Sequence, residues 1–252
     1  TSVPGGGTAA VAPPSKAAPR GGGGGVCGLV ANGLTALDVD GAGVTGTLPP
    51  CLTAPGSDLV ELHVGNNALT GPLPAVAASS PLEALTAYNN GLTGALPPSL
   101  AGAPALVSLD LTNNRIAGAI PPALGSNGVL KYVVLKANRL TGGIPAALAT
   151  TPNLETLDVK NNSLTRIPAE WVEGWPGAAN SSLVNVRISF NGVEGPFPAG
   201  LAAAPALTFL VVNNNSLAGE LPAGPDGMFP ALRALNGSNN ALTGPIPAAW
   251  GT

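Results

Sequence analysis

A single motif recurs along the chain from residue 34 onward, at intervals of about 24 residues. Its clearest copy, LVSLDLTNNRIAGAIP, covers residues 106–121 and carries apolar residues at its first, fourth, sixth, eleventh and fifteenth positions. The same frame begins nine times, at Leu34, Leu59, Leu82, Leu106, Leu130, Leu154, Leu183, Leu207 and Leu232. A period of this length predicts a solenoid, in which each copy forms one coil and buries its apolar side against the next.

The positions of the motif have separate structural roles. Apolar fourth and sixth positions alternate with outward ones, which predicts a short strand, and stacked copies would form a parallel sheet with its apolar side inward. An Asn at the ninth position, where the chain turns inward, is expected to bond backbone groups that are away from water. It is present in every copy but the first: Asn67, Asn90, Asn114, Asn138, Asn162, Asn191, Asn215 and Asn240. Gly and Pro then end the strand and begin a loosely helical return path.

The spacing LxxLxLxxNxLTGxIPxxL, seen in LVELHVGNNALTGPLPAVA and LETLDVKNNSLTRIPAEW, resembles the plant-type leucine-rich repeats of receptor-kinase ectodomains and polygalacturonase-inhibiting proteins. The resemblance covers about residues 29–252. It implies an α/β solenoid, a right-handed horseshoe of nine repeats with a concave parallel sheet and short 3₁₀ or irregular turns on the convex side. A scaffold of this kind does not identify a ligand.

Composition narrows the functional classes. Only 9% of the residues are charged and the net charge is −3, which argues against a nucleic-acid partner or an anionic membrane surface. No apolar run approaches the ~20 residues that span a bilayer. The chain has one His, no P-loop, no Gly-x-Ser-x-Gly motif and no metal-ligand spacing. We therefore expect a protein that is not an enzyme and holds no metal or cofactor.

Other segments flank and interrupt the repeats. Residues 1–25 are rich in Pro and Gly and predict a flexible linker ahead of one repeat domain over 26–252. Within that domain, 26–33 resembles an abbreviated N-terminal cap, and about 169–182 forms an insertion. Because the last repeat is truncated, we expect further sequence or an assembly partner to cover the C-terminal end.

Two tryptophans stand where other copies carry Leu. Trp171 and Trp250 are therefore expected in the core. Trp175 belongs to the insertion and is expected to pack against its own loop, with a partner contact as the alternative.

The two cysteines are placed for pairing. If the repeat is carried back by one virtual coil of about 24 residues, Cys27 falls at, or one residue from, the point that Cys51 occupies. Equivalent points on neighbouring coils lie roughly 5 Å apart, which a disulfide can span. We predict a Cys27–Cys51 disulfide, with two free buried thiols as the alternative.

A polar column crosses the first copies. Asp38, His63 and Thr86 occupy the fifth position of three successive strands, where their side chains could form hydrogen bonds. An open sheet face lacks a pocket and evident oxyanion donors, so we expect a solvated polar ladder and no catalysis.

Four N-x-[ST] sequons occur, at Asn161, Asn180, Asn214 and Asn236, which is close to the number expected by chance. Asn161 and Asn214 lie at the exposed strand exit and Asn180 in the insertion, so all three should be reachable by a glycosylation enzyme, and we expect at least one of them to carry an N-glycan. Asn236 lies on the sheet, where a glycan would obstruct that face.

The outward strand positions form the candidate binding face. Acidic residues gather in the early copies, and basic and aromatic residues in the middle and late ones, where neighbouring strands could merge into an apolar strip with a basic flank. Scattered side chains on a solvated face are the alternative. The predicted contact residues are Tyr88, Tyr132, Val134, Lys136, Lys160, Arg187, Phe209 and Val211.

Together these features predict a secreted or cell-surface module that recognises a protein, peptide or wall polysaccharide through its concave face. The basic flank would suit an acidic peptide or a polyuronate. A structural scaffold repeat of an extracellular surface or cell-wall assembly is the alternative, and ice binding through the Asn and Thr rows at the eighth and twelfth motif positions is a weaker one.

Overall fold

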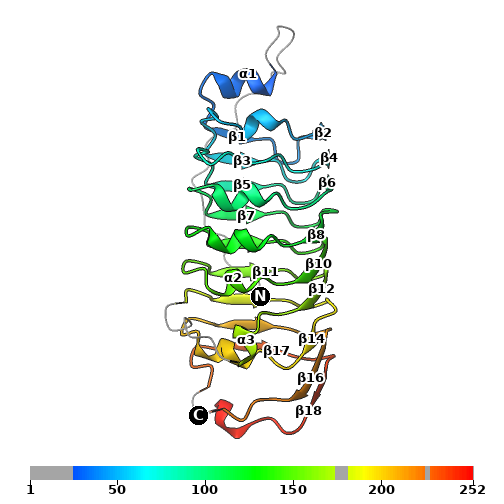
Figure 1. Ribbon diagram of the computed structural model, residues 1–252. Helices are drawn as coiled ribbons and strands as arrows, with labels where there is room; N and C mark the ends of the chain where they lie inside the picture. The colour runs from blue at the N-terminus through cyan, green and yellow to red at the C-terminus, as the bar shows by residue number, and fades with distance from the viewer. Residues whose placement is uncertain (1–24, 174–180, 225–227, 252) are drawn as a thin grey trace.

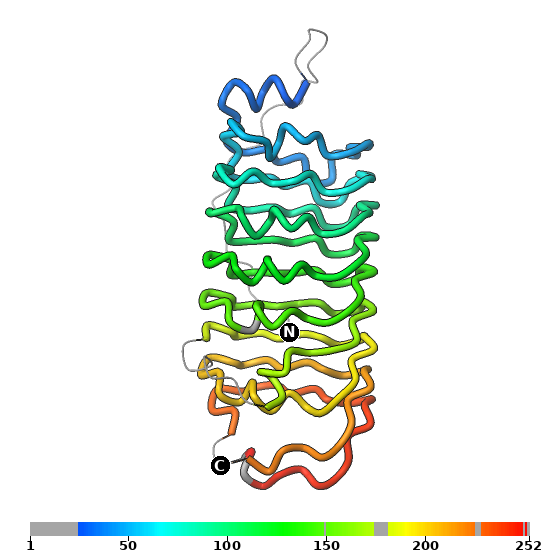
Figure 2. The backbone as a smooth tube through the Cα atoms, in the orientation of Figure 1, coloured from blue at the N-terminus to red at the C-terminus, as the bar shows by residue number. Residues whose placement is uncertain are grey.

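The computed structural model describes residues 25–173, 181–224 and 228–251, so the predicted linker lies outside them except for its last residue. The chain winds into coils that stack in one column, with α1 (Val26–Ala31) at one end (Figures 1 and 2). No helix within these ranges is long and apolar enough to cross a membrane. The predicted solenoid is confirmed.

One strand from each copy of the motif enters a nine-stranded parallel sheet, in chain order. Neighbouring strands pair in register, so that Leu109 lies opposite Leu85 on one side and Val133 on the other. The fourth motif position therefore forms a continuous apolar column inside the solenoid. The strands are β1 (Ala36–Asp38), β3 (Glu61–His63), β5 (Ala84–Thr86), β7 (Ser108–Asp110), β9 (Tyr132–Val134), β11 (Thr156–Asp158), β13 (Asn185–Arg187), β15 (Phe209–Val211) and β17 (Ala234–Asn236).

A second set of short parallel strands follows the Asn turn, along the right-hand edge of Figure 1. The sequence did not predict them, because their Gly- and Thr-rich segments lack a clear alternation of apolar residues. They form three separate three-stranded sheets. The strands are β2 (Thr45–Thr47), β4 (Ala68–Gly71) and β6 (Gly91–Leu92); β8 (Ala117–Ala119), β10 (Arg139–Gly143) and β12 (Ser163–Arg166); and β14 (Glu194–Gly195), β16 (Ser216–Glu220) and β18 (Ala241–Thr243).

Short helical turns occupy the return path, as predicted. Three of them begin with a proline, which needs no backbone hydrogen bond at a helix start. The turns are η1 (Pro50–Leu52), η2 (Pro98–Gly102), η3 (Pro122–Ser126), α2 (Ala146–Ala149), α3 (Glu170–Glu173), η5 (Ala199–Ala203) and η6 (Ala248–Gly251).

The Asn column links neighbouring coils. The Nδ2 of Asn114 donates to the carbonyl of Ala87 in the preceding coil at 2.9 Å and to that of Leu111 at 3.1 Å. Its Oδ1 accepts from the amide of Leu92 at 3.0 Å. The same bonds recur at the other seven asparagines of the column. The predicted amide ladder therefore satisfies backbone groups that no strand pairs.

A disulfide joins Cys27 in α1 to Cys51 in η1, with the two Cα atoms 5.6 Å apart. This confirms the predicted pairing. Leu34 and Leu37 of the first coil are only partly buried, so the covalent link holds a coil that has less apolar packing than those in the middle of the column.

At the two motif positions where Trp replaces the usual Leu, the tryptophan side chains pack in the core, as predicted. Trp171 is fully buried, at 0% exposure. Trp250 is partly buried, its ring centroid lies 5.6 Å from that of Phe197, and its Nε1 donates to the carbonyl of Pro222 at 3.0 Å. Trp175 lies outside the described residues, as does the rest of 174–180 within the predicted insertion.

Candidate functional site

The outward side of the nine-stranded sheet, which we call the strand face, carries columns of side chains that run from coil to coil. Strand register fixes these columns, because each residue lies opposite its counterpart in the next copy. The column at the fifth motif position reads Asp38, His63, Thr86, Asp110, Val134, Asp158, Arg187, Val211 and Asn236. The first part of the strand face is thus acidic and the later part mixed basic and apolar.

The predicted apolar residues do not merge into one strip. Tyr132 and Val134 project from β9, whereas Phe209 and Val211 project from β15. The intervening β11 and β13 present polar side chains, so the expectation of a continuous strip is not met. Tyr132 and Phe209 are nevertheless exposed, at 40% and 38%.

Tyr88 belongs to the acidic half instead. Tyr88 is half-buried, and its hydroxyl donates to the carboxylate of Asp40 at 2.5 Å. This hydrogen bond, with burial and the neighbouring negative charges, raises the pKa of Tyr88 to about 12. Its hydroxyl is thus engaged within the protein, as is the hydroxyl of Tyr132, which donates to Glu155 Oε2 at 2.8 Å.

A hollow of about 390 Å³ opens on the later half of the strand face. It brings together four of the predicted contact residues. Three cationic side chains and one carboxylate surround it. The lining therefore has a net positive charge, which an anionic ligand can neutralise. The lining residues are Lys136, Asp158, Lys160, Arg187, Ser189, Phe190, Val211, Asn213 and Asn236.

Asp158 is the one acidic residue of this lining, and its side chain is 7% exposed. Burial raises the pKa of its carboxyl group, and the backbone amide of Lys160 and the charge of Arg187 act in the opposite direction. The amide donates to Asp158 Oδ1 at 3.1 Å, and Arg187 Nη1 lies 3.9 Å from Oδ2. Arg187 is therefore oriented by a buried group, while Lys136 and Lys160 form no ion pair among the described residues.

Phe190 is a lining residue that the sequence reasoning missed. Its φ is 56°, in the left-handed region, and its side chain is 47% exposed. At the equivalent position, six other copies place an Asn in the same conformation, which a short polar side chain tolerates better than a bulky ring. Lys160 Nζ lies 5.1 Å from the ring centroid of Phe190. The sequence feature that could have identified this residue is a Phe at a motif position where most copies carry Asn.

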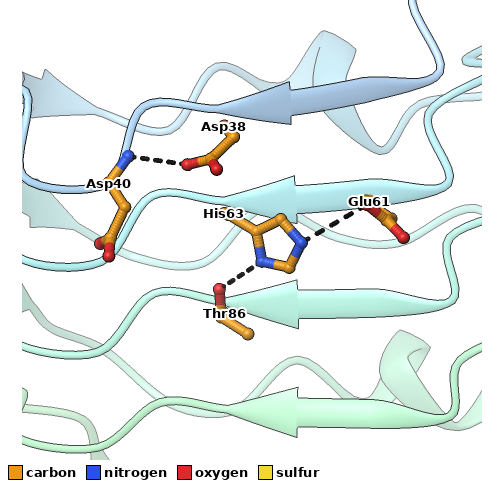
Figure 3. Close-up of polar contacts among 5 residues, drawn as sticks. All are labelled: Asp38, Asp40, Glu61, His63 and Thr86. Carbon is orange, nitrogen blue, oxygen red and sulfur yellow. Dashed lines mark hydrogen bonds and ion pairs between the residues drawn. The ribbon is translucent and has the colours of Figure 1, made fainter. Parts of the chain in front are cut away.

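The acidic half contains the polar cluster of Figure 3. His63 Nδ1 lies 2.8 Å from Thr86 Oγ1, and Nε2 lies 3.6 Å from Glu61 Oε2. Asp38 does not join this cluster and accepts the backbone amide of Asp40 instead. The backbone amides that follow these strands bond the next strand, so no pair of donors is aimed at a reacting oxygen. The cluster is a polar ladder on an open sheet.

Comparison with known proteins agrees with this geometry. The family model "Leucine Rich Repeat" matches residues 105–127 and 153–175. Two solved plant structures resemble the chain along most of its length. The peptide hormone receptor RGFR1 in complex with RGF2 is 29% identical, with a TM-score of 0.74 over 86% of this chain. The leucine-rich-repeat ectodomain of GASSHO1/SCHENGEN3 from Arabidopsis thaliana, in complex with CASPARIAN STRIP INTEGRITY FACTOR 2, is 32% identical, with a TM-score of 0.76 over 85% of this chain.

This chain is a plant-type leucine-rich-repeat protein. The leucine-rich-repeat chain spans 34% of the RGFR1 chain and 25% of the GASSHO1/SCHENGEN3 chain. It also resembles a plant ice-binding protein, at 27% identity and a TM-score of 0.73, over 88% of this chain and 69% of that one. No curated protein sequence matches it.

The sequons of the leucine-rich-repeat chain differ in their surroundings. Asn161 is exposed at the strand exit, whereas Asn214 is half-buried and its Oδ1 accepts from Asn239 at 3.0 Å. Asn236 is exposed and lines the hollow, and Asn180 lies outside the described residues. Glycosylation of these sites stays a prediction, and of the described ones Asn161 and Asn236 are exposed.

Proposed function

We propose that this chain is an extracellular ligand-binding module, and that the hollow on its strand face recognises an anionic, carboxylate-bearing ligand. The observation that carries the proposal is the convergence of Lys136, Lys160 and Arg187 around one buried carboxylate. Two further observations support it. The two similar plant receptors, one of them named a peptide hormone receptor, are complexes with RGF2 and with CASPARIAN STRIP INTEGRITY FACTOR 2. A disulfide suits an oxidising, extracellular compartment.

The hollow offers separate contacts for charge and for a ring. Within the described ranges no carboxylate pairs with the ammonium groups of Lys136 and Lys160, and a ligand carboxylate would supply a partner. The exposed ring of Phe190 gives an apolar surface beside them, on which a sugar ring or an aliphatic side chain can rest. Both a polyuronate and an acidic peptide have this combination of groups.

The test is a titration of the purified chain with a short oligogalacturonate, a glutamate-rich peptide and a neutral glucan. We expect at least one of the two anionic probes to bind, with an affinity that falls as salt is added, and the glucan to bind weakly or not at all. The double variant Lys136→Gln with Lys160→Gln should bind the anionic probe at least tenfold more weakly than the parent. Asp158→Asn should bind the anionic probe more tightly than the parent, because the substitution removes the one acidic side chain of the lining.

The matched control is Arg139→Gln with Arg166→Gln, which removes the same charge from exposed positions on β10 and β12, away from the strand face. If this control weakens binding as much as the lysine pair, attraction is non-specific and the hollow is not the site. Tyr132→Ala with Phe209→Ala then reports whether the predicted aromatic contacts outside the hollow also take part. We expect that pair to weaken binding at least tenfold if the ligand extends along the strand face.

Ice binding is a second candidate, favoured by the similarity to a plant ice-binding protein. Exposed threonines line the edge formed by the short sheets, among them Thr45, Thr70, Thr141 and Thr243. The Thr70 hydroxyl donates to the carbonyl of Gly46 at 3.2 Å, and is thus partly engaged within the protein. Measuring thermal hysteresis of the dilute protein separates the candidates, since an ice-binding edge depresses the freezing point and a ligand hollow does not.

A further inference from the structure

Charge is segregated along the column. After Arg20 the next Lys or Arg in the chain is Arg115, so the first three coils and the strand of the fourth contain no Lys or Arg side chain. The strand face of those coils carries Asp38, Asp40, Glu61, Glu83 and Asp110, whereas the later coils present Lys131, Lys136, Lys160, Arg187 and Arg233. One face therefore has an acidic half and a basic half.

The acidic half is not neutralised within the chain. The ion pairs of the described residues that involve Lys or Arg, Lys131–Glu155 and Arg187–Asp158, both lie in the basic half. In the acidic half the one pair is formed by His63 with Glu61, at 3.6 Å. Like charges on neighbouring strands of an open sheet repel each other. A partner that brings positive charge to this half would remove that cost.

The chain itself has the complementary surface. A half-turn about an axis parallel to the strands, lying in front of the face, turns a second copy toward the first and reverses the order of its coils. The acidic half of each copy then meets the basic half of the other, and both contacts form at once, as a two-fold interface requires. A basic partner of another kind would meet only one half.

We propose that two copies of this chain associate through their strand faces, in this antiparallel arrangement. The face extends about 40 Å along the stack and about 20 Å across it, so it could bury about 800 Å² on each copy, the size of a standard specific interface. Near the axis lie the middle strands, where the exposed ring of Tyr132 gives an apolar anchor between the two charged contacts. The association covers the hollow, so a ligand there competes with it.

Sedimentation at low and high salt tests the proposal on the full chain. We expect a dimer at low salt that dissociates as salt screens the paired halves. Glu61→Lys with Glu83→Lys removes most of the negative charge of the acidic half, and Lys136→Glu with Lys160→Glu removes the positive excess of the basic half. Each variant alone should dimerise at least tenfold more weakly than the parent. An equimolar mixture of the two should form a heterodimer, because the unchanged basic half of the first variant meets the unchanged acidic half of the second.

The matched control is Glu194→Lys with Glu220→Lys, which makes the same charge change at exposed residues of β14 and β16, away from the strand face. It should dimerise like the parent. A parent that stays monomeric at low salt and high concentration overturns the proposal, as does a dimer that neither reversal weakens or a mixture that stays monomeric. The outcome is independent of the ligand proposal, because the first variant leaves the hollow intact and its binding of oligogalacturonate is measured separately.

Discussion

Phe190 and Asp158 show how single residues of a repeat acquire a role that the repeat does not need. A bulky residue with φ of 56° is strained, and the neighbouring copies avoid that strain with Asn. Asp158 is a buried carboxylate in a column whose other members are exposed or half-buried. Both residues line the same hollow, so the two departures from the motif coincide in space.

The raised pKa of Asp158 makes a prediction about stability. Because the folded state holds this proton more tightly than the unfolded chain does, the contribution of Asp158 is present below the unfolded pKa and is lost as the pH rises through the folded pKa. Asp158→Asn cannot ionise and keeps an oxygen for the amide of Lys160. We expect the variant to be more stable than the parent at pH 7, by about 1 kcal/mol, and the difference to shrink toward pH 4.

Urea denaturation at several pH values measures this difference. Glu194→Gln serves as the control, since it removes one carboxylate from an exposed position on β14. If the Asp158→Asn variant is more stable than the parent by the same free energy at every pH, the added stability comes from packing and not from ionisation of Asp158.

At the scale of elements, neighbouring coils are joined by the long sheet, the short sheets and the Asn ladder. These contacts repeat along the column, so each coil depends mainly on its two neighbours. The first coil has a neighbour on one side only and less buried apolar surface, and there the Cys27–Cys51 disulfide supplies the missing restraint.

Loss of this disulfide should loosen the first coil and leave the middle of the column unchanged. We expect Cys27→Ser with Cys51→Ser to destabilise the N-terminal end by about 3 kcal/mol, because the bond closes a loop with a sequence separation of 24 residues. Hydrogen exchange should become faster in α1 and β1 but not in β9. Alkylation of the unreduced parent followed by mass spectrometry is the companion measurement, and two labelled thiols would contradict the disulfide itself.

At the scale of the whole molecule, the rigid column presents every coil on one continuous face. Such a face can bind without ordering a loop, which lowers the cost of association. The proposed ligand and the proposed second copy both use the basic half, so an anionic ligand is expected to favour the monomer. The proposed ligand binding and the proposed dimer would thus both depend on the same charge distribution.

The repeat period, the parallel sheet, the amide ladder and the Cys27–Cys51 pairing were predictable from the sequence, because each depends on spacing within or between adjacent coils. The separation of Tyr132 from Phe209 by two polar strands, the short second sheets, and the partnership of His63 with Glu61 rather than Asp38 were not. These features depend on strand register, on side-chain rotamers and on which neighbours remove a group from water. Hence Asp158 and Phe190 came together as lining residues only in the folded column, where residues from different coils enclose one hollow.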